Sequence, residues 1–132
     1  MFSFDRIKIW TRVRSIYFFI ALTFYVLTEA GRFIYRPYIY NYGIKDLGFA
    51  DVVGNLFGTI VIIFVELGIL HANKVQGIRL IALITTGICL YELSQFILPR
   101  GVLDWKDLIA TLVAGMITLG IFLIINHLFE TK

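Results

Sequence analysis

The sequence predicts an all-α, polytopic membrane protein with four transmembrane helices, arranged as two similar hairpins with both termini in the cytoplasm. Of the 132 residues, 59% are hydrophobic and 16% are charged, and the mean hydropathy is +0.85. A soluble domain of this length would need many more polar residues to cover its surface. The apolar residues form four runs, each near the about 20 residues that a bilayer-spanning helix requires. We therefore expect a single four-helix transmembrane domain over residues 1–132.

The chain begins with a basic segment. Residues 1–14 combine basic side chains with Trp10, a composition typical of a segment that lies on a membrane surface. The first span is predicted over residues 15–35, and Pro37 is expected to end it, because proline interrupts a helix interior. No small-x-small cleavage site follows this run, so we interpret it as a retained helix and not as a signal peptide.

The last third of the first span is polar on one side. Glu29, Arg32 and Arg36 are spaced i, i+3 and i+7, which places them on one face of a helix. Residues 38–50 contain glycines and several tyrosines, so they are expected to form a connection at the membrane–water interface. The first hairpin would thus present its charged residues near this connection.

The second span is predicted over residues 51–72, with Asp51 as the N-cap. Asp51 and Asn55 begin a polar stripe along this helix. Gly54 and Gly58 form a small-xxx-small pair, a spacing that lets a neighbouring helix approach closely. We therefore expect both a polar face and a packing face on this span.

The third span is predicted over residues 78–98 and the fourth over residues 107–129. Asp104 is expected to be the N-cap of the fourth helix. Asp107 is placed so that its carboxylate can bond back to the free N–H groups of the first turn. Gly115 is a further small residue on this helix and is expected to serve helix packing.

The basic residues give the orientation. The side with both termini and the middle loop carries seven of them: Arg6, Lys8, Arg12, Arg14, Lys74, Arg79 and Lys132. The other side carries five, nearly balanced by acids: Arg32, Arg36, Lys45, Arg100 and Lys106. The positive-inside rule then puts both termini in the cytoplasm. The protein is expected to be a multi-pass protein of a bacterial cytoplasmic membrane whose polar helix ends face outward.

The two hairpins resemble each other in sequence. The segment Glu29–Pro37 matches Glu92–Arg100 at the leading Glu and at a Phe-Ile pair. The segment Asp51–Gly58 matches Asp107–Ala114 at Asp, at Leu and in the placing of small residues. Both hairpins would run in–out–in, which predicts a parallel repeat with a pseudo-twofold axis along the membrane normal. Such an axis would arrange the two glutamates and the two aspartates around one outer-facing cleft.

The candidate binding residues are polar or charged side chains at the outer helix ends: Glu92, Gln95, Arg100, Asp104, Asp107, Glu29, Arg32, Arg36, Asp51 and Asn55. Glu92 lies about two turns, roughly 10 Å, inside the predicted end of its helix. A carboxylate at that depth must pair, take up a proton or contact water. The alternative to a ligand site is a network of ion pairs and caps that closes the third and fourth helices.

The segment Glu92–Asp107 follows the pattern E-x-x-Q-x-x-x-P-R-x-x-x-D-x-x-D at a span–loop–span junction. In this pattern the chain resembles the VanZ-like family of small membrane proteins, and Asp51, Asn55 and Gly58 look like the family's other polar helix start. Thr111 departs from the family pattern, which would have Asn there. The founding member is associated with low-level resistance to teicoplanin, a glycopeptide that acts on cell-wall precursors outside the membrane. The resemblance therefore implies a role at the cell envelope.

Three functions fit these patterns. The first, which we favour, is the binding or shielding of a cell-envelope headgroup, such as a lipid-linked cell-wall precursor or a glycopeptide. The second is an accessory subunit of a larger complex, docked to a membrane protein partner through Gly54 and Gly58. The third is an intramembrane enzyme that uses Glu92 and Asp107 as an acid–base pair on a lipid-linked substrate.

Other functions are disfavoured. The net charge of +3 is too small and too evenly spread to predict nucleic-acid binding, so the expected surroundings are membrane lipids. No nucleophile–His–acid set, phosphate loop or nucleotide fingerprint occurs, which makes catalysis a weaker expectation than binding. No histidine has a Cys or His neighbour at ligand spacing, and we expect no metal or other cofactor. The alternative is that the acidic residues hold Mg²⁺ or Ca²⁺.

Overall fold

The computed structural model describes residues 4–70, 72–97 and 104–130, and they form helices joined by short turns. In chain order the elements are α1 (Phe4–Ala30), a π-helical turn η1 (Gly31–Tyr35), α2 (Arg36–Tyr42), α3 (Phe49–Ile69), α4 (Lys74–Ser94) and α5 (Trp105–Glu130). This described part of the chain contains no strand. The prediction of an all-α fold is confirmed.

Four helical segments of the described chain are long and apolar enough to cross a membrane: Trp10–Tyr42, Phe49–Ile69, Lys74–Ser94 and Trp105–Phe129. Each overlaps with one of the four predicted spans, although their boundaries differ. The chain is therefore a multi-pass membrane protein by the length and composition of its helices.

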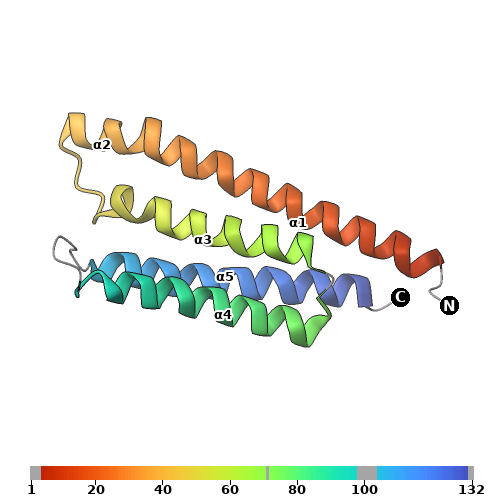
Figure 1. The fold of residues 1–132 in the computed structure, drawn as a ribbon. Helices are drawn as coiled ribbons and strands as arrows, with labels where there is room; N and C mark the ends of the chain where they lie inside the picture. The colour runs from red at the N-terminus through yellow and green to blue at the C-terminus, as the bar shows by residue number, and fades with distance from the viewer. Residues whose placement is uncertain (1–3, 71, 98–103, 131–132) are drawn as a thin grey trace.

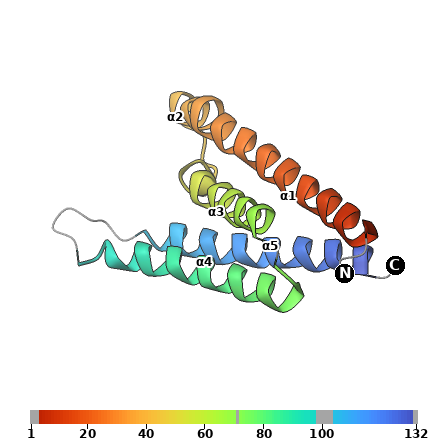
Figure 2. The same ribbon diagram turned by 45° about the vertical axis from the view of Figure 1, so that its right-hand side comes forward.

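The helices form an elongated bundle (Figure 1). α3 lies between α1 and the antiparallel pair of α4 and α5 (Figure 2). The start of α1 and the end of α5 lie at one end of the bundle. The opposite end, which we call the turn end, holds α2, the start of α3, the end of α4 and the start of α5. Both termini thus lie on one side, as an in–out–in repeat requires.

The contacts between helices agree with two equivalent hairpins. α1 packs along α3, α4 packs along α5, and α3 and α5 pack against each other, with smaller contacts between α3 and α4 and between α1 and α5. Exchanging α1 with α4 and α3 with α5 leaves this set of contacts unchanged. The pseudo-twofold axis suggested by the sequence would run between α3 and α5.

The first hairpin differs from the prediction at Pro37. The helix does not stop there but continues through η1 and α2 to Tyr42, with Pro37 in the first turn of α2. In η1 the backbone N–H of Arg36 donates to the carbonyl of Gly31, an i→i+5 bond that widens the turn. Proline has no backbone N–H, and the first turn of a helix does not use one. Pro37 therefore costs no hydrogen bond in the first turn of α2, and the chain stays helical. The helix ends at Gly43, whose φ of 61° is the left-handed conformation that glycine adopts readily.

Further boundaries differ from the prediction: α3 spans Phe49–Ile69 and not 51–72, and α4 ends at Ser94 and not at 98. The basic residues 1–14 were predicted as a separate segment, but α1 begins at Phe4 and runs into the first span without a break. α4 begins at Lys74 and not near residue 78, because Asn73 and Gln76 form a capping box. The Asn73 side chain accepts from the Gln76 N–H at 2.9 Å, and the Gln76 side chain accepts from the Asn73 N–H at 3.0 Å.

The apolar core lies where α1, α3 and α5 meet. Phe64 and Phe122 are almost fully buried, and the ring of Tyr17 lies 5.8 and 6.3 Å from their ring centroids. Ile60 and Ile63 are fully buried beside them. In a bilayer such close packing is what favours one helix arrangement over others, since lipid tails are as apolar as these side chains.

The three packing glycines have different surroundings. A Cβ added to Gly115 would lie 2.6 Å from the Thr85 Oγ1 atom, so this glycine brings α5 close to α4. A Cβ added to Gly54 or Gly58 would meet no atom within 4 Å. The prediction that these two glycines admit a neighbouring helix is therefore wrong for the helices of this chain, because α1 and α5 approach α3 on other faces.

Candidate functional site

Glu92 is the centre of a polar cluster at the turn end. Its side chain is buried, with 5% of the residue exposed. The carboxylate accepts a hydrogen bond from Asn55 Nδ2 on α3 at 3.3 Å and another from Gln95 Nε2 at 2.9 Å. A buried carboxylate is costly without such donors, so the two amides stabilise Glu92 in this position. The structure thus brings together three predicted site residues from two helices.

Two more carboxylates join from the start of α5. Asp104 caps this helix as predicted, since its Oδ1 accepts from the backbone N–H of Lys106 at 2.9 Å. Asp107 was expected to bond back to the first turn, but its side chain makes no such bond among the described residues. It lies instead near Glu92, Asp104 and Asn55, close enough for their charges and dipoles to interact. We call Glu92, Asn55, Gln95, Asp104 and Asp107 the Glu92 cluster.

The Glu92 cluster is acidic. None of the lysines and arginines whose side chains the structure describes forms an ion pair with its three carboxylates, because the described ion pairs join other residues. Arg100, a predicted member of the site, lies outside the described residues. Thr111 is fully buried, and its hydroxyl donates to the carbonyl of Asp107 at 3.0 Å. That hydroxyl is therefore used within its own helix.

Arg36 and Asp51 form an ion pair beside the cluster. Arg36 Nη2 lies 3.4 Å from Asp51 Oδ1, which also accepts a hydrogen bond from the Tyr40 hydroxyl. The guanidinium of Arg36 lies over the Tyr40 ring, 5.6 Å from its centroid. The two charged side chains are 51% and 38% exposed, so the pair contributes at most about 1 kcal/mol to stability. Its role is to join α2 to the first turn of α3.

Glu29 and Arg32 stand apart from this arrangement. Their side chains pair with each other at 3.7 Å, with Arg32 60% exposed and Glu29 31% exposed. The expected common face with Arg36 is lost because the wide turn of η1 shifts the helical register between Arg32 and Arg36. The predicted symmetry of Glu29 with Glu92 is therefore not present in the contacts: one glutamate is buried between helices and the other pairs locally.

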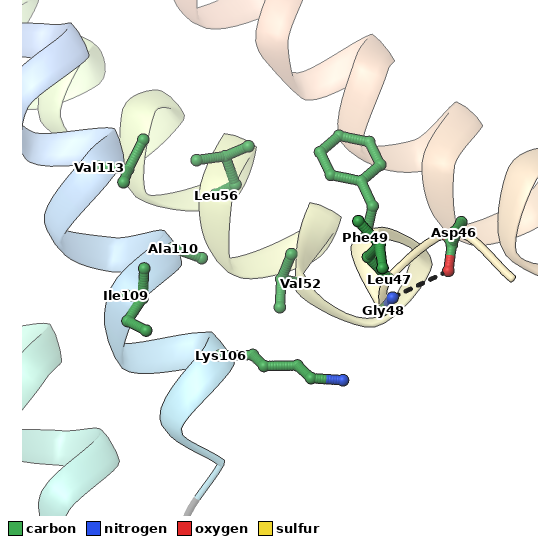
Figure 3. A pocket seen from close by; sticks show the side chains of 10 residues that line it. All are labelled: Asp46, Leu47, Gly48, Phe49, Val52, Leu56, Lys106, Ile109, Ala110 and Val113. Atoms are coloured by element: carbon green, nitrogen blue, oxygen red, sulfur yellow. Dashed lines mark hydrogen bonds between the residues drawn. The ribbon is translucent and has the colours of Figure 1, made fainter.

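Asp46 organises the turn before α3, and Asp51 was wrongly predicted to cap this helix. The Asp46 carboxylate accepts from the backbone N–H group of Gly48 at 3.0 Å (Figure 3). It also accepts from the backbone N–H group of Ala50 at 2.7 Å and from the Tyr35 hydroxyl at 3.2 Å. Burial alone would raise the pKa of Asp46, but these hydrogen bonds outweigh it and lower the pKa below the ordinary value. Gly48 is the N-cap residue, with a φ of 84°.

Sequence reasoning missed Asp46, Tyr35 and Tyr40. A signal for Asp46 was available, because an aspartate two residues before a glycine and shortly before an apolar run is typical of a helix start. The two tyrosines carried no such signal, since their hydroxyls reach their partners only because η1 and α2 continue the helix past Arg32. Among the residues that the structure describes, no group of three or more His, Cys, Asp or Glu side chains is arranged to hold a metal ion.

Comparisons of the chain with protein-family models, with curated proteins and with solved structures found no match. What the site can bind must therefore be inferred from its own geometry. Glu92 is buried, its neighbours are acidic, and each of the two amides within reach gives one N–H to its carboxylate. Acceptor oxygens therefore outnumber free donors in the cluster.

Proposed function

We propose that this chain is a VanZ-like protein of a bacterial cytoplasmic membrane that binds or shields a cell-envelope headgroup at its outer face. The observation that supports this best is the Glu92 cluster, with three carboxylates, none of which forms an ion pair with a described lysine or arginine. The cluster lies at the turn end, opposite the end with both termini. The positive-inside rule assigns the turn end to the outside, where cell-wall precursors and glycopeptides are encountered.

The donors and acceptors of the cluster limit the ligand. Asn55 and Gln95 each donate one N–H to Glu92, so the acceptor oxygens of the cluster outnumber the amide N–H groups that remain. A ligand that binds here must therefore donate, through an ammonium group or through several hydroxyl groups. Lipid-linked cell-wall precursors carry sugar hydroxyls and peptide amines, and glycopeptides carry both. These are the headgroups that the cluster fits by chemistry.

The test is purification in a mild detergent followed by native mass spectrometry with a lipid-linked cell-wall precursor or teicoplanin added as the probe. We expect the wild-type protein to keep one probe molecule and the Glu92→Gln variant to lose it. The matched control is Glu29→Gln, which removes a carboxylate from the same end of the bundle but outside the cluster. Equal retention by both variants, or no retention by the wild type, would contradict the proposal.

The open face at Gly54 and Gly58 supports a second candidate function, that of an accessory subunit. No atom of the described chain lies within 4 Å of a Cβ added at either position, so the face is free for a helix of another protein. The Gly58→Leu variant should fold normally but lose a co-purifying membrane protein. Retention of the partner by Gly58→Leu would exclude this face as its docking site.

A further inference from the structure

A shallow groove runs between α3 and α5 (Figure 3). Its volume is about 400 Å³, and none of the described residues of the Glu92 cluster lines it. The walls are apolar and come from both helices: Val52, Leu56, Ile109, Ala110 and Val113. The turn from Asp46 to Phe49 and the side chain of Lys106 surround its mouth.

Lys106 extends from the first turn of α5 across this mouth towards the turn before α3 (Figure 3). A Cβ added at Gly48 would contact the Lys106 Nζ atom, so the missing side chain of Gly48 leaves room for the ammonium group. Asp46 is the acid that lines the same mouth, and its oxygens bond Gly48, Ala50 and Tyr35. Among the described residues, Lys106 forms no ion pair. The mouth therefore carries a positive charge that no described carboxylate pairs with.

The positions of the two helices set the depth of the groove in a bilayer. α3 and α5 are both candidate spans, so the apolar walls lie among lipid chains. Lys106 is the second residue of α5, which puts its ammonium at the membrane–water interface, where lipid phosphates lie. A second lysine, Lys45, lines the adjoining hollow together with Lys106, Asp46 and Asp51. The groove thus has apolar walls with a cation above them. A membrane lipid has the matching arrangement, an apolar chain with an anionic phosphate above it.

We propose that the groove between α3 and α5 seats an acyl chain of a bilayer lipid whose anionic phosphate headgroup is held by Lys106. This site is separate from the Glu92 cluster, and it would stand even if that cluster bound nothing. Its recognition elements are the charge of Lys106 and the depth of the groove at Val113. Each can be removed without changing the other.

The neighbouring Trp105 makes the proposal measurable. The chain has two tryptophans, and Trp105 is 63% exposed beside Lys106. In a Trp10→Phe background, Trp105 reports alone on lipids that carry brominated chains, since bromine quenches tryptophan fluorescence on contact. The protein is reconstituted in phosphatidylcholine bilayers that contain brominated phosphatidylglycerol or brominated phosphatidylcholine. One lysine near a membrane surface corresponds to an about fivefold preference for the anionic lipid.

We expect that Lys106→Gln abolishes this fivefold preference. The matched control, Arg79→Gln, removes one positive charge near the opposite end of the bundle and should keep the preference. Val113→Phe should fill the groove and reduce quenching by both lipids. Ile109→Phe fills it from a more exposed position and replaces Val113→Phe if that variant loses its helical circular dichroism.

Three results would overturn the proposal. The first is equal quenching of the wild type by the two lipids. The second is a preference that Lys106→Gln leaves unchanged or that Arg79→Gln removes equally. The third is quenching that neither groove-filling variant reduces. Inorganic phosphate tests a soluble anion as the occupant: if it removes the preference and chloride of equal ionic strength does not, the site holds a free phosphate and no lipid.

Discussion

The side chain of Asn55 on α3 donates a hydrogen bond of 3.3 Å to Glu92 on α4, although these two helices contact each other much less than either contacts α5. The bond joins residues that lie 37 positions apart in the chain. It is thus a polar link across a lightly packed pair of helices, and one of its partners is a buried carboxylate. Interhelical hydrogen bonds in membrane proteins contribute about 0.6 kcal/mol on average and up to about 1.7 kcal/mol.

Asn55→Ala should lower the free energy of unfolding by about 1 kcal/mol, because Glu92 then keeps only the Gln95 amide. Asn55→Asp should lower it further, since it places a fourth carboxylate among three. Denaturation with sodium dodecyl sulfate, followed by circular dichroism, measures both changes. If Asn55→Ala is as stable as the wild type, the link does not hold α3 to α4.

Glu92→Gln should behave in the opposite way and raise the free energy of unfolding of the ligand-free protein by roughly 1 kcal/mol, because it removes like-charge repulsion from Asp104 and Asp107. The new amide keeps the shape of the carboxylate, and the Asn55 or Gln95 amide can turn to accept from it. A variant that is more stable but binds no probe would be the expected signature of a ligand site. Lower stability would instead show that the carboxylate serves the fold.

Much of the fold followed from the sequence because a bilayer limits the choices. Every backbone polar group must be satisfied within a span, so four apolar runs lead to four helices. The boundaries were harder, because they depend on side-chain bonds of single residues. The capping box of Asn73 with Gln76 places the start of α4 four residues before the predicted one, and the turn at Asp46 places the start of α3 two residues before it. The π-helical turn before Pro37 has no simple pattern in sequence, and it changed which face Arg36 occupies.

The candidate site was also predicted only in part. Asn55, Glu92, Gln95 and Asp107 were expected near one another because all four were placed at outer helix ends, and the structure brings them together. The symmetry argument failed at Glu29, because a repeat in sequence does not fix the partner of each side chain. Lys106 and the groove that it borders could not be foreseen, since the groove depends on how α3 and α5 cross.

The turn before α3 predicts a response to acid. The pKa of Asp46 is lowered in the folded protein, so its carboxylate contributes stability above the ordinary value of 3.8 and loses it as the pH falls through the folded value. The wild type should therefore lose stability in this acidic window more steeply than Asp46→Asn, which cannot titrate. Tyr35→Phe removes one of the hydrogen bonds to Asp46 and should give a smaller change of slope. Parallel slopes for wild type and Asp46→Asn would contradict the assignment.

The glycines on α3 and α5 predict opposite results for one substitution. Gly115→Ala places a methyl group 2.6 Å from the Oγ1 atom and 2.7 Å from the Cγ2 atom of Thr85, a short β-branched side chain that cannot move far. We expect the free energy of unfolding to fall by about 1–3 kcal/mol through overpacking. Gly58→Ala meets nothing within 4 Å and should be neutral or stabilise the helix by up to about 1 kcal/mol.

The partner residue tests whether Gly115→Ala acts through contact with α4. Thr85→Ala removes the two atoms closest to the new methyl group and leaves only the Thr85 Cβ atom at 3.2 Å, so the double variant should recover most of the stability that Gly115→Ala loses. The coupling energy of the cycle should then be at least about 1 kcal/mol, the size found for residues in direct contact. Additive changes would mean that α4 and α5 do not approach each other at Gly115. In that case the second hairpin would pack less closely than the arrangement of its helices indicates.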